Sequence, residues 1–253
     1  MRRQHTQQAS LRIHSVRSLA VCVAAFTLVA GSTVTPASEP DSGNVMGTVL
    51  GRSDQPLKEY RAFRRMHAAT DKSSHEAWLE AWTELKDGRF TYDIVSERGS
   101  EMVRGKVLRS MLEREQELVN SGNTAKGELS DANYDFSEAG RDVDGSRVVE
   151  IKPKRKDVLL VDGHAVLDHG GDLVRVEGRL AKNPSFWTSL VNIVRRYARI
   201  GGVRVPIATE TTAKVKMVGT SKLQVTYDYV SVNGMPVRVN ATSSEAPAHS
   251  AAR

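Results

Sequence analysis

Cysteine is nearly absent from this sequence. Its 253 residues include one, Cys22, which lies inside the apolar run Leu19–Ala30. Val21 stands directly before it and most of the apolar run follows it, an arrangement that disfavours a lipid anchor at this position. We expect Cys22 to leave with a signal peptide. Disulfide bonds and thiol catalysis are therefore excluded for the mature chain.

The sequence also lacks an apolar run long enough for a permanent transmembrane helix. The run Leu19–Ala30 follows four arginines, the last of which is Arg17, and precedes small residues that end in "TPA" at Ala37. Basic, apolar and small-residue zones in this order predict a secretory signal peptide over residues 1–37. We expect cleavage near Ala37, with cleavage after Ala30 as the alternative, and a periplasmic mature protein.

A strong excess of charge is absent once the signal peptide is set aside. The full chain has 36 Lys and Arg against 30 Asp and Glu, and four of the arginines lie in the signal peptide. Removing them leaves 32 basic and 30 acidic side chains, a net charge of +2. A charge so close to neutral gives no support to nucleic-acid binding, so no nucleic-acid partner is expected.

Composition divides the rest of the chain into three parts. Glycine, serine, proline and aspartate are frequent in residues 38–52, and residues 240–253 read "NATSSEAPAHSAAR". Such segments bury too little apolar surface to fold, which predicts a disordered lead and a disordered tail. Residues 53–239 are enough for a single domain with a sizeable core.

Two segments carry apolar residues at helical spacing, which predicts two helices. The first begins near Asp54, a candidate N-cap, and has Pro56 in its first turn. Its apolar positions are Leu57, Tyr60, Phe63 and Met66. The second begins after Ser100 and ends near Ser121 and Gly122. Its apolar stripe consists of Met102, Val103, Val107, Leu108, Met111 and Leu112.

Strand patterns fill most of the remainder. Asp87-Gly88 stands between two runs that hold aromatic and β-branched residues, which predicts a β-hairpin. From Tyr134 to Gly234 apolar and polar residues mostly alternate, which is typical of antiparallel strands with one buried face. The segment Pro184–Tyr197 fits a third helix, although "NIVRRYARI" from Asn192 onward also fits a strand. The sequence therefore predicts an α+β domain dominated by its sheet.

Candidate catalytic groups are few. His164, Asp168, His169 and Asp172 lie within nine positions, and histidine with carboxylate suits zinc. The same residues also suit the wet side of a strand and the turn that follows it, and we favour that interpretation. No nucleophile elbow, P-loop or zincin motif occurs. We therefore expect no enzyme, no cofactor and no metal, with a metal-dependent hydrolase as the weaker alternative.

Seven segments between Leu57 and Gly234 are similar to the outer-membrane lipoprotein-sorting proteins of bacteria, which have the Lol-carrier-like fold. They are "YRAFRRMHA", "EAWTELKDGRFTYDIVSERGSE", "NYDF", "KPKRKD", "RVEGRLAKNPSFW", "RRYARIGGVRVP" and "VTYDYVSVNG". The chain resembles an uncharacterised branch of that family. The resemblance implies a strongly curved antiparallel sheet, an unclosed half-barrel, with helices across its concave face and an apolar cavity between them.

This resemblance and the apolar patterns together lead to a functional hypothesis. We expect a periplasmic protein that binds a lipid or a lipoprotein by holding an acyl chain, possessing no catalytic residues. The candidate cavity residues are Trp78, Trp82, Met102, Met111, Leu112, Phe186 and Trp187. The alternative is an envelope sensory or scaffolding module that binds protein partners.

Overall fold

Eleven strands form one antiparallel sheet in the computed structural model, which describes residues 54–71, 75–186, 188–216 and 219–237. The strands are β1 (Tyr60–Thr70), β2 (Glu76–Lys86), β3 (Arg89–Gly99), β4 (Tyr134–Arg141), β5 (Arg147–Pro153), β6 (Val161–Leu167), β7 (Leu173–Leu180), β8 (Thr188–Ile200), β9 (Val203–Val215), β10 (Gly219–Val232) and β11 (Met235–Pro236). The predicted signal peptide, lead and tail, as well as Trp187, lie outside the described residues.

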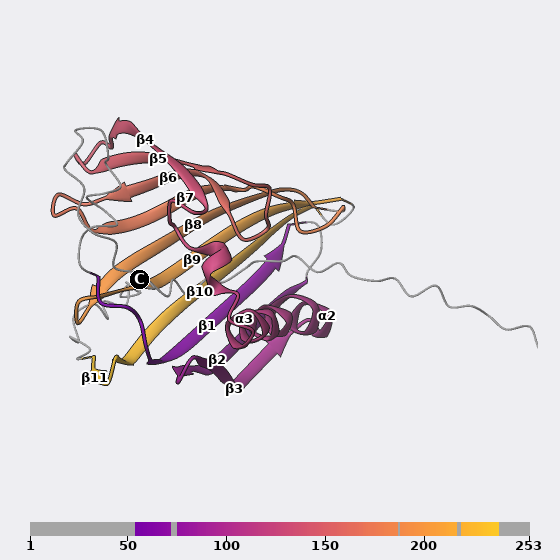
Figure 1. Ribbon diagram of the computed structural model, residues 1–253. Coiled ribbons are helices and arrows are strands. Elements are labelled where there is room, and N and C mark those ends of the chain that lie inside the picture. Colours follow the sequence, from indigo (N-terminus) through magenta and orange to yellow (C-terminus); the bar gives the residue numbers. More distant parts are fainter. Residues whose placement is uncertain (1–53, 72–74, 187, 217–218, 238–253) are drawn as a thin grey trace, which may run out of the picture.

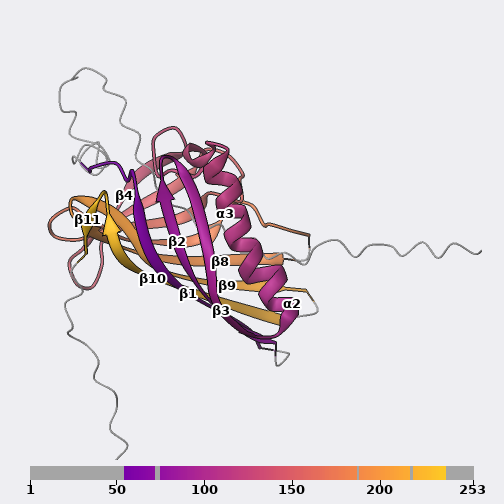
Figure 2. The ribbon, with the colours of Figure 1, turned by 90° about the horizontal axis from the view of Figure 1, so that it is seen from below.

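The strand order is β3-β2-β1-β10-β9-β8-β7-β6-β5-β4, with the short β11 on β10. Consecutive strands from β4 to β10 pair with one another as a meander, and β10 then pairs with β1. The sheet does not close, because β3 and β4 remain as its two edges. It curves strongly, as Figures 1 and 2 show.

A single helical run connects these two edges. It consists of α2 (Glu101–Val103), η1 (Arg104–Arg109) and α3 (Ser110–Asn120), and the 3₁₀ turn η2 (Thr124–Gly127) follows it. Because β3 and β4 are at opposite edges, the chain between them has to cross one face of the sheet, and it crosses the concave one. Figure 2 shows the helical run on that side. The predicted α+β architecture and the helix after Ser100 are confirmed.

The helix predicted from Leu57 to Met66 is wrong, because this segment enters the sheet as β1. Its buried positions follow a period of two and are Tyr60, Ala62, Arg64, Met66 and Ala68. Phe63, which fitted the helical spacing, lies on the opposite face against Trp82. Asp54 caps no helix and instead pairs with Arg199 and Arg204. In Pro184–Tyr197 the strand alternative holds from Thr188 onward, as β8.

The predicted hairpin at Asp87-Gly88 is confirmed and joins β2 to β3. Both residues have positive φ, 51° at Asp87 and 72° at Gly88, as the two-residue turn that matches the twist of the strands requires. A side chain at Gly88 would meet no atom within 4 Å, so only backbone conformation limits this position.

A substitution at Gly88 therefore tests the cost of positive φ without a change in packing. We expect Gly88→Ala to lower the free energy of unfolding by about 1 kcal/mol, because alanine disfavours positive φ. Gly105 is the matched control: it lies in the helical run, also with open space around it. Gly105→Ala should raise stability by about 0.5–1 kcal/mol. Urea denaturation measures both, and equal effects of the two substitutions would contradict the turn geometry.

The buried apolar residues form two clusters on the concave side. The first joins α3 and η1 to β1, β2, β3 and β10, with Leu79, Leu108 and Leu112 among its fully buried members. The second lies over β5 to β8 and includes Leu129 and Leu160 from connecting segments. The helical run thus covers one half of the concave face, while loops cover part of the other half.

Candidate functional site

A cavity of about 590 Å³ lies between the helical run and the loop after β5. Its apolar lining comes from Met111 and Leu118 of α3 and from Val158 and Leu159 of the loop. Leu118, Val158 and Leu159 are only half-buried, so apolar surface remains uncovered at this place. The helix presents these side chains because Met111 and Leu118 are seven residues apart, which is two helical turns.

Charged and polar side chains complete the lining of this cavity. They are Arg114, Glu115, Glu117, Ser121, Asn123, Lys126 and Asp157. All but Glu115 and Asp157 are exposed or lie in exposed turns at the end of α3. Asp157 is held by its loop, where its carboxylate accepts a hydrogen bond from the Leu159 amide at 3.0 Å. The cavity therefore has an apolar interior and a charged rim, an arrangement that suits an amphiphile.

A buried ion pair stands beside the cavity and joins α3 to the sheet. The Arg64 guanidinium on β1 donates to the Glu115 carboxylate from Nη1 at 2.5 Å and from Nη2 at 3.2 Å. Arg64 is 0% and Glu115 4% exposed. Two parallel hydrogen bonds of this kind fix the relative orientation of both groups. The pair thus ties the middle of α3 to the concave face.

Aromatic rings surround this pair. The Arg64 guanidinium lies 4.6 Å from the Tyr227 ring centroid and 5.5 Å from that of Phe90, and its Nη2 donates to the Tyr60 hydroxyl at 3.3 Å. Burial by itself lowers the pKa of Arg64, but the Glu115 carboxylate and the neighbouring phenols outweigh it and hold that pKa well above its ordinary value. Burial raises the pKa of Tyr60, Tyr227 and Tyr229. Arg64 therefore stays charged and the phenols stay neutral at physiological pH.

The seven residues that the sequence predicts for the cavity lie at different places in the structure. Met111 lines the cavity, and Leu112 is fully buried in the first apolar cluster. Met102 is 49% exposed at the start of α2. Phe186 is 80% exposed in the turn before β8, with the Lys216 ammonium 4.1 Å from its ring centroid, and Trp187 lies outside the described residues.

Trp78 and Trp82 lie on the other face of the sheet. Their neighbours on β2, among them Ala77, Leu79 and Ala81, face the helical run and are fully buried. Successive side chains of a strand point to opposite faces, so the two indoles, at positions that alternate with these residues, point outward. The predicted residues therefore do not line one common cavity.

Sequence reasoning missed the ion pair and the loop that closes the cavity. Glu115 continues the apolar stripe of α3, four residues after Met111 and four before Val119. Arg64 lies between Ala62 and Met66 on the buried face of β1. A carboxylate in a helical stripe and an arginine in an apolar strand face were the available signals. Nothing in the sequence around Leu159 indicates that its loop approaches α3.

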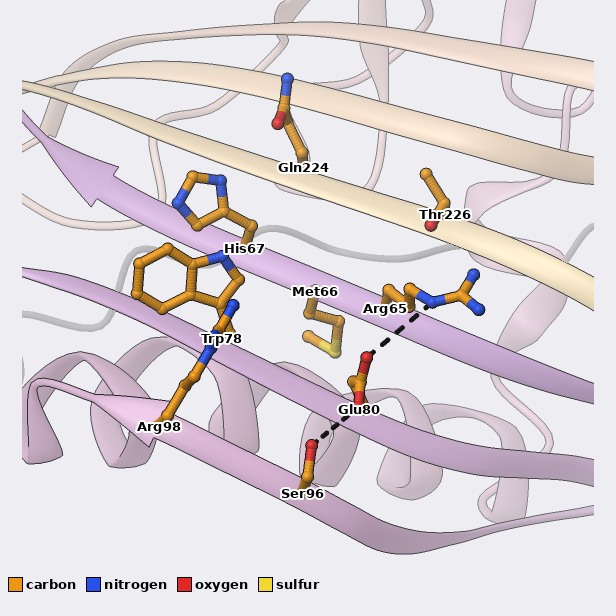
Figure 3. A pocket seen from close by; sticks show the side chains of 9 residues that line it. All are labelled: Arg65, Met66, His67, Trp78, Glu80, Ser96, Arg98, Gln224 and Thr226. Atoms are coloured by element: carbon orange, nitrogen blue, oxygen red, sulfur yellow. Dashed lines mark hydrogen bonds and ion pairs between the residues drawn. The ribbon is translucent and has the colours of Figure 1, made fainter. Parts of the chain in front are cut away.

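The outer, convex face carries a second hollow, a groove of about 530 Å³ over β3, β2, β1 and β10 (Figure 3). Two rows of side chains form its walls. The first row is Arg98, Trp78, His67 and Gln224, and the second row is Ser96, Glu80, Arg65 and Thr226. Neighbours within each row are register partners on adjacent strands. The groove therefore runs across the strands.

The histidine and aspartate motif occupies the end of β6 and the turn after it. His164 is exposed, and the Asp168 carboxylate accepts a hydrogen bond from the Asp172 amide at 2.8 Å, which closes the turn. Within residues 54–71, 75–186, 188–216 and 219–237, no three His, Cys, Asp or Glu side chains are arranged to hold a metal ion. In the same ranges no helix has the length and apolar character to cross a membrane.

Comparison with known proteins gives a small number of distant matches. No protein-family model matches the chain, and no curated protein matches its sequence. Among solved structures, a DUF1329 family protein from Desulfovibrio piger is 12% identical with a TM-score of 0.39, covering 73% of this chain and 90% of its own. A LolA superfamily protein from Nitrosomonas europaea is 15% identical with a TM-score of 0.39, covering 76% and 94%.

The third match is a putative outer membrane lipoprotein-sorting protein domain from Vibrio parahaemolyticus. It is 11% identical with a TM-score of 0.39, covering 76% of this chain and 92% of its own. The names of the Nitrosomonas and Vibrio proteins agree with the family that the sequence resembles.

Proposed function

We propose that this protein binds a lipid or a lipoprotein in the periplasm by holding an acyl chain between α3 and the loop after β5. The observation that carries the proposal is the cavity of about 590 Å³ beside α3, with uncovered apolar side chains inside and charges at its rim. Its volume falls within the range of roughly 300–1,000 Å³ that is typical of small-molecule sites.

The chemistry of the lining supports an amphiphile over a wholly polar ligand. Leu118, Val158 and Leu159 are half-buried and offer aliphatic surface to a hydrocarbon chain. Arg114, Glu117 and Lys126 lie at the rim, where a polar headgroup would remain in contact with water. Binding of this kind makes and breaks no covalent bond, so the proposal assigns no catalytic residue and no cofactor.

Burial of hydrocarbon supplies the binding free energy. Each buried methylene gains roughly 0.8 kcal/mol, so about eight of them gain on the order of 6 kcal/mol before ordering costs. Affinity in the micromolar range requires about 8 kcal/mol, so a longer chain or headgroup contacts would supply the remainder. The ligand is therefore expected to be a long acyl chain.

Delivery to the periplasm is part of the same proposal. The basic, apolar and small-residue zones of residues 1–37 support export with removal of a signal peptide near Ala37. N-terminal sequencing of the protein recovered from the periplasm tests this step. A product that still begins at Met1, or that carries a lipid on Cys22, would contradict it.

A titration with fluorescently labelled palmitate tests acyl binding. We expect saturable binding at micromolar protein, and we expect Leu118→Trp to weaken it at least tenfold, because the indole would fill the cavity. Leu118 is half-buried, so this change should leave the core intact. Met102→Trp is the matched control in the same helical run, at a site outside the cavity.

Two results would contradict the proposed site. The first is no saturable binding by the unmodified protein. The second is equal binding by Leu118→Trp and Met102→Trp, which would place an acyl site elsewhere in the molecule. Circular dichroism of each variant confirms that it is folded before the titration is interpreted.

A further inference from the structure

Six neighbouring strands bring several basic segments to the same end of the sheet. At this end β5, β7 and β9 finish and β6, β8 and β10 begin, as their antiparallel registers require. The Ala181 amide after β7 donates to the Leu160 carbonyl before β6 at 2.9 Å, so these two connections are in contact. In Figure 1 it is the end toward which the arrows of β1 and β3 point.

The sequence concentrates positive charge at this end. Residues 152–160, 179–186, 214–216 and 219–222 hold nine Lys and Arg and one acidic residue, Asp157. Setting these apart from the 32 basic and 30 acidic side chains of the mature chain leaves 23 basic and 29 acidic ones. The net charge is therefore +8 in these segments and −6 over the remainder of the mature chain.

Six of the nine basic side chains keep an unbalanced charge. The other three, Lys154, Arg155 and Arg179, each pair with an aspartate. Within the described parts of the chain the six form no ion pair, and all of them are exposed. We call these six side chains the basic end; they are Lys152, Lys156, Lys182, Lys214, Lys216 and Lys222.

The extent of the basic end indicates the size of its partner. It spans the strands from β5 to β10, and neighbouring strands about 4.8 Å apart give it a length of about 24 Å along the sheet. Like charges placed side by side add to one positive field. An extended anionic surface contacts all six lysines together, whereas one small anion reaches only a few of them.

An exposed aromatic ring lies among these lysines. Phe186 stands just before β8 and is 80% exposed, and the Lys216 ammonium lies 4.1 Å from its ring centroid. Such a ring gains free energy when it leaves water for an apolar medium. Lysines together with an exposed phenylalanine are typical of surfaces that bind at the interface of an anionic bilayer. An acidic protein would match the lysines but would need a separate pocket for the ring.

The proposed acyl cavity lies at the same end of the sheet. One of its walls is formed by Asp157, Val158 and Leu159, which follow Lys156 directly in the loop after β5. A chain that leaves a bilayer has its shortest path into the cavity when this end faces the bilayer. This part of the argument rests on the proposed function, whereas the charge asymmetry and the exposed ring do not depend on it.

We propose that the basic end and Phe186 dock this protein on the surface of a bilayer that contains anionic lipid. The six lysines contact the lipid phosphates, and the Phe186 ring enters the interface. The remainder of the mature chain, with its net charge of −6, is repelled by the same surface. The field therefore orients the molecule as well as attracting it, with the cavity beside α3 next to the lipid.

Co-sedimentation of the mature protein with lipid vesicles tests the docking. We expect binding to vesicles of phosphatidylglycerol and phosphatidylethanolamine, and much weaker binding to vesicles of phosphatidylcholine. Binding should be lost as NaCl rises from about 0.1 M to about 1 M, because the Debye length falls from about 10 Å to about 3 Å. Lys156→Glu, Lys182→Glu and Lys214→Glu together should weaken binding at least about tenfold, since each lysine near the surface contributes about fivefold.

Two controls match these changes at the opposite end of the sheet. Lys58→Glu, Lys86→Glu and Arg89→Glu together reverse three exposed charges there and should leave vesicle binding unchanged. Phe186→Ser tests the ring and should weaken binding about fivefold. Its control is Val143→Ser, because Val143 is fully exposed in the turn between β4 and β5.

Several outcomes would overturn the docking proposal. They are no binding to the anionic vesicles, equal binding to phosphatidylcholine, equal effects of the two triple variants, and equal binding by Phe186→Ser and Val143→Ser. Binding of a glutamate decapeptide without binding of vesicles would also overturn it and would assign the basic end to an acidic protein.

Failure of docking and failure of the acyl site are distinguishable. Labelled palmitate should bind the Lys156, Lys182 and Lys214 triple variant as it binds the unmodified protein, because none of these lysines lines the cavity. Leu118→Trp should in turn bind anionic vesicles as the unmodified protein does, since Leu118 lies inside the cavity and outside the basic end.

Discussion

Glu115→Ala is expected to lower the free energy of unfolding by about 3–5 kcal/mol, because it leaves the Arg64 guanidinium charged and without its buried carboxylate. Arg64 is fully buried, and both of its terminal nitrogens contact Glu115. Its Nε already has no hydrogen-bond partner in the structure.

A second variant distinguishes the free energy lost with the ion pair from the cost of leaving one buried charge without its partner. In Arg64→Met with Glu115→Leu both charges are absent, and we expect stability to recover to within about 1–2 kcal/mol of the unmodified protein. A double-mutant cycle then gives the coupling between the two residues. Urea denaturation followed by circular dichroism measures each free energy under the two-state assumption.

The control is a solvent-exposed ion pair on the same sheet. Arg196 and Glu210 pair across β8 and β9 with side chains 47% and 46% exposed. Glu210→Ala should therefore cost less than about 1 kcal/mol. If Glu115→Ala costs no more than Glu210→Ala, the helix is not tied to the sheet by this pair, and another contact must hold α3 in place.

The sequence indicated most of this architecture because strand and helix periods are local properties. Alternation after Tyr134 identified the meander, and the Asp87-Gly88 pair identified the hairpin between β2 and β3, since both signals depend on neighbouring residues only. The run Leu57–Met66 was misread for a physical reason. Leu57, Tyr60, Phe63 and Met66 recur at helical spacing, but Phe63 lies on the outer face of β1 against Trp82, and the buried positions of β1 follow a period of two.

The candidate site was less accessible because it depends on partners far apart in the chain. Arg64 and Glu115 are 51 residues apart, and β1 meets β10 across more than half of the chain. An arginine in a strand and a glutamate in a helix are ordinarily surface residues, so neither signals a buried pair. Trp78 and Trp82 were predicted to line the cavity, but their four-residue spacing does not say which face of the sheet they occupy. They alternate along β2 with Ala77, Leu79 and Ala81, which face the helical run and are fully buried.

Gly163→Ala is expected to be as damaging as loss of the buried pair, with a cost on the order of 3 kcal/mol, although it adds one methyl group. Gly163 on β6 and Gly178 on β7 are register partners. A Cβ at Gly163 would lie 2.1 Å from the Glu177 carbonyl oxygen and 2.6 Å from the Gly178 Cα. These are backbone atoms of the neighbouring strand, so no side-chain rotation relieves the contact. Two facing glycines let the strands approach closely where the sheet curves, and curvature is what makes the concave face.

The neighbouring residue on β6 supplies the control for this change. His164 is exposed on the opposite face, so His164→Ala should alter stability by less than about 0.5 kcal/mol. Gly178→Ala should cost about as much as Gly163→Ala, since its Cβ would lie 2.3 Å from the Asp162 carbonyl oxygen. The two substitutions together should cost less than their sum, because a single separation of β6 from β7 relieves both contacts. A Gly163→Ala protein as stable as His164→Ala in urea would show that the two strands are not held this closely, and that the curvature of the sheet has another origin.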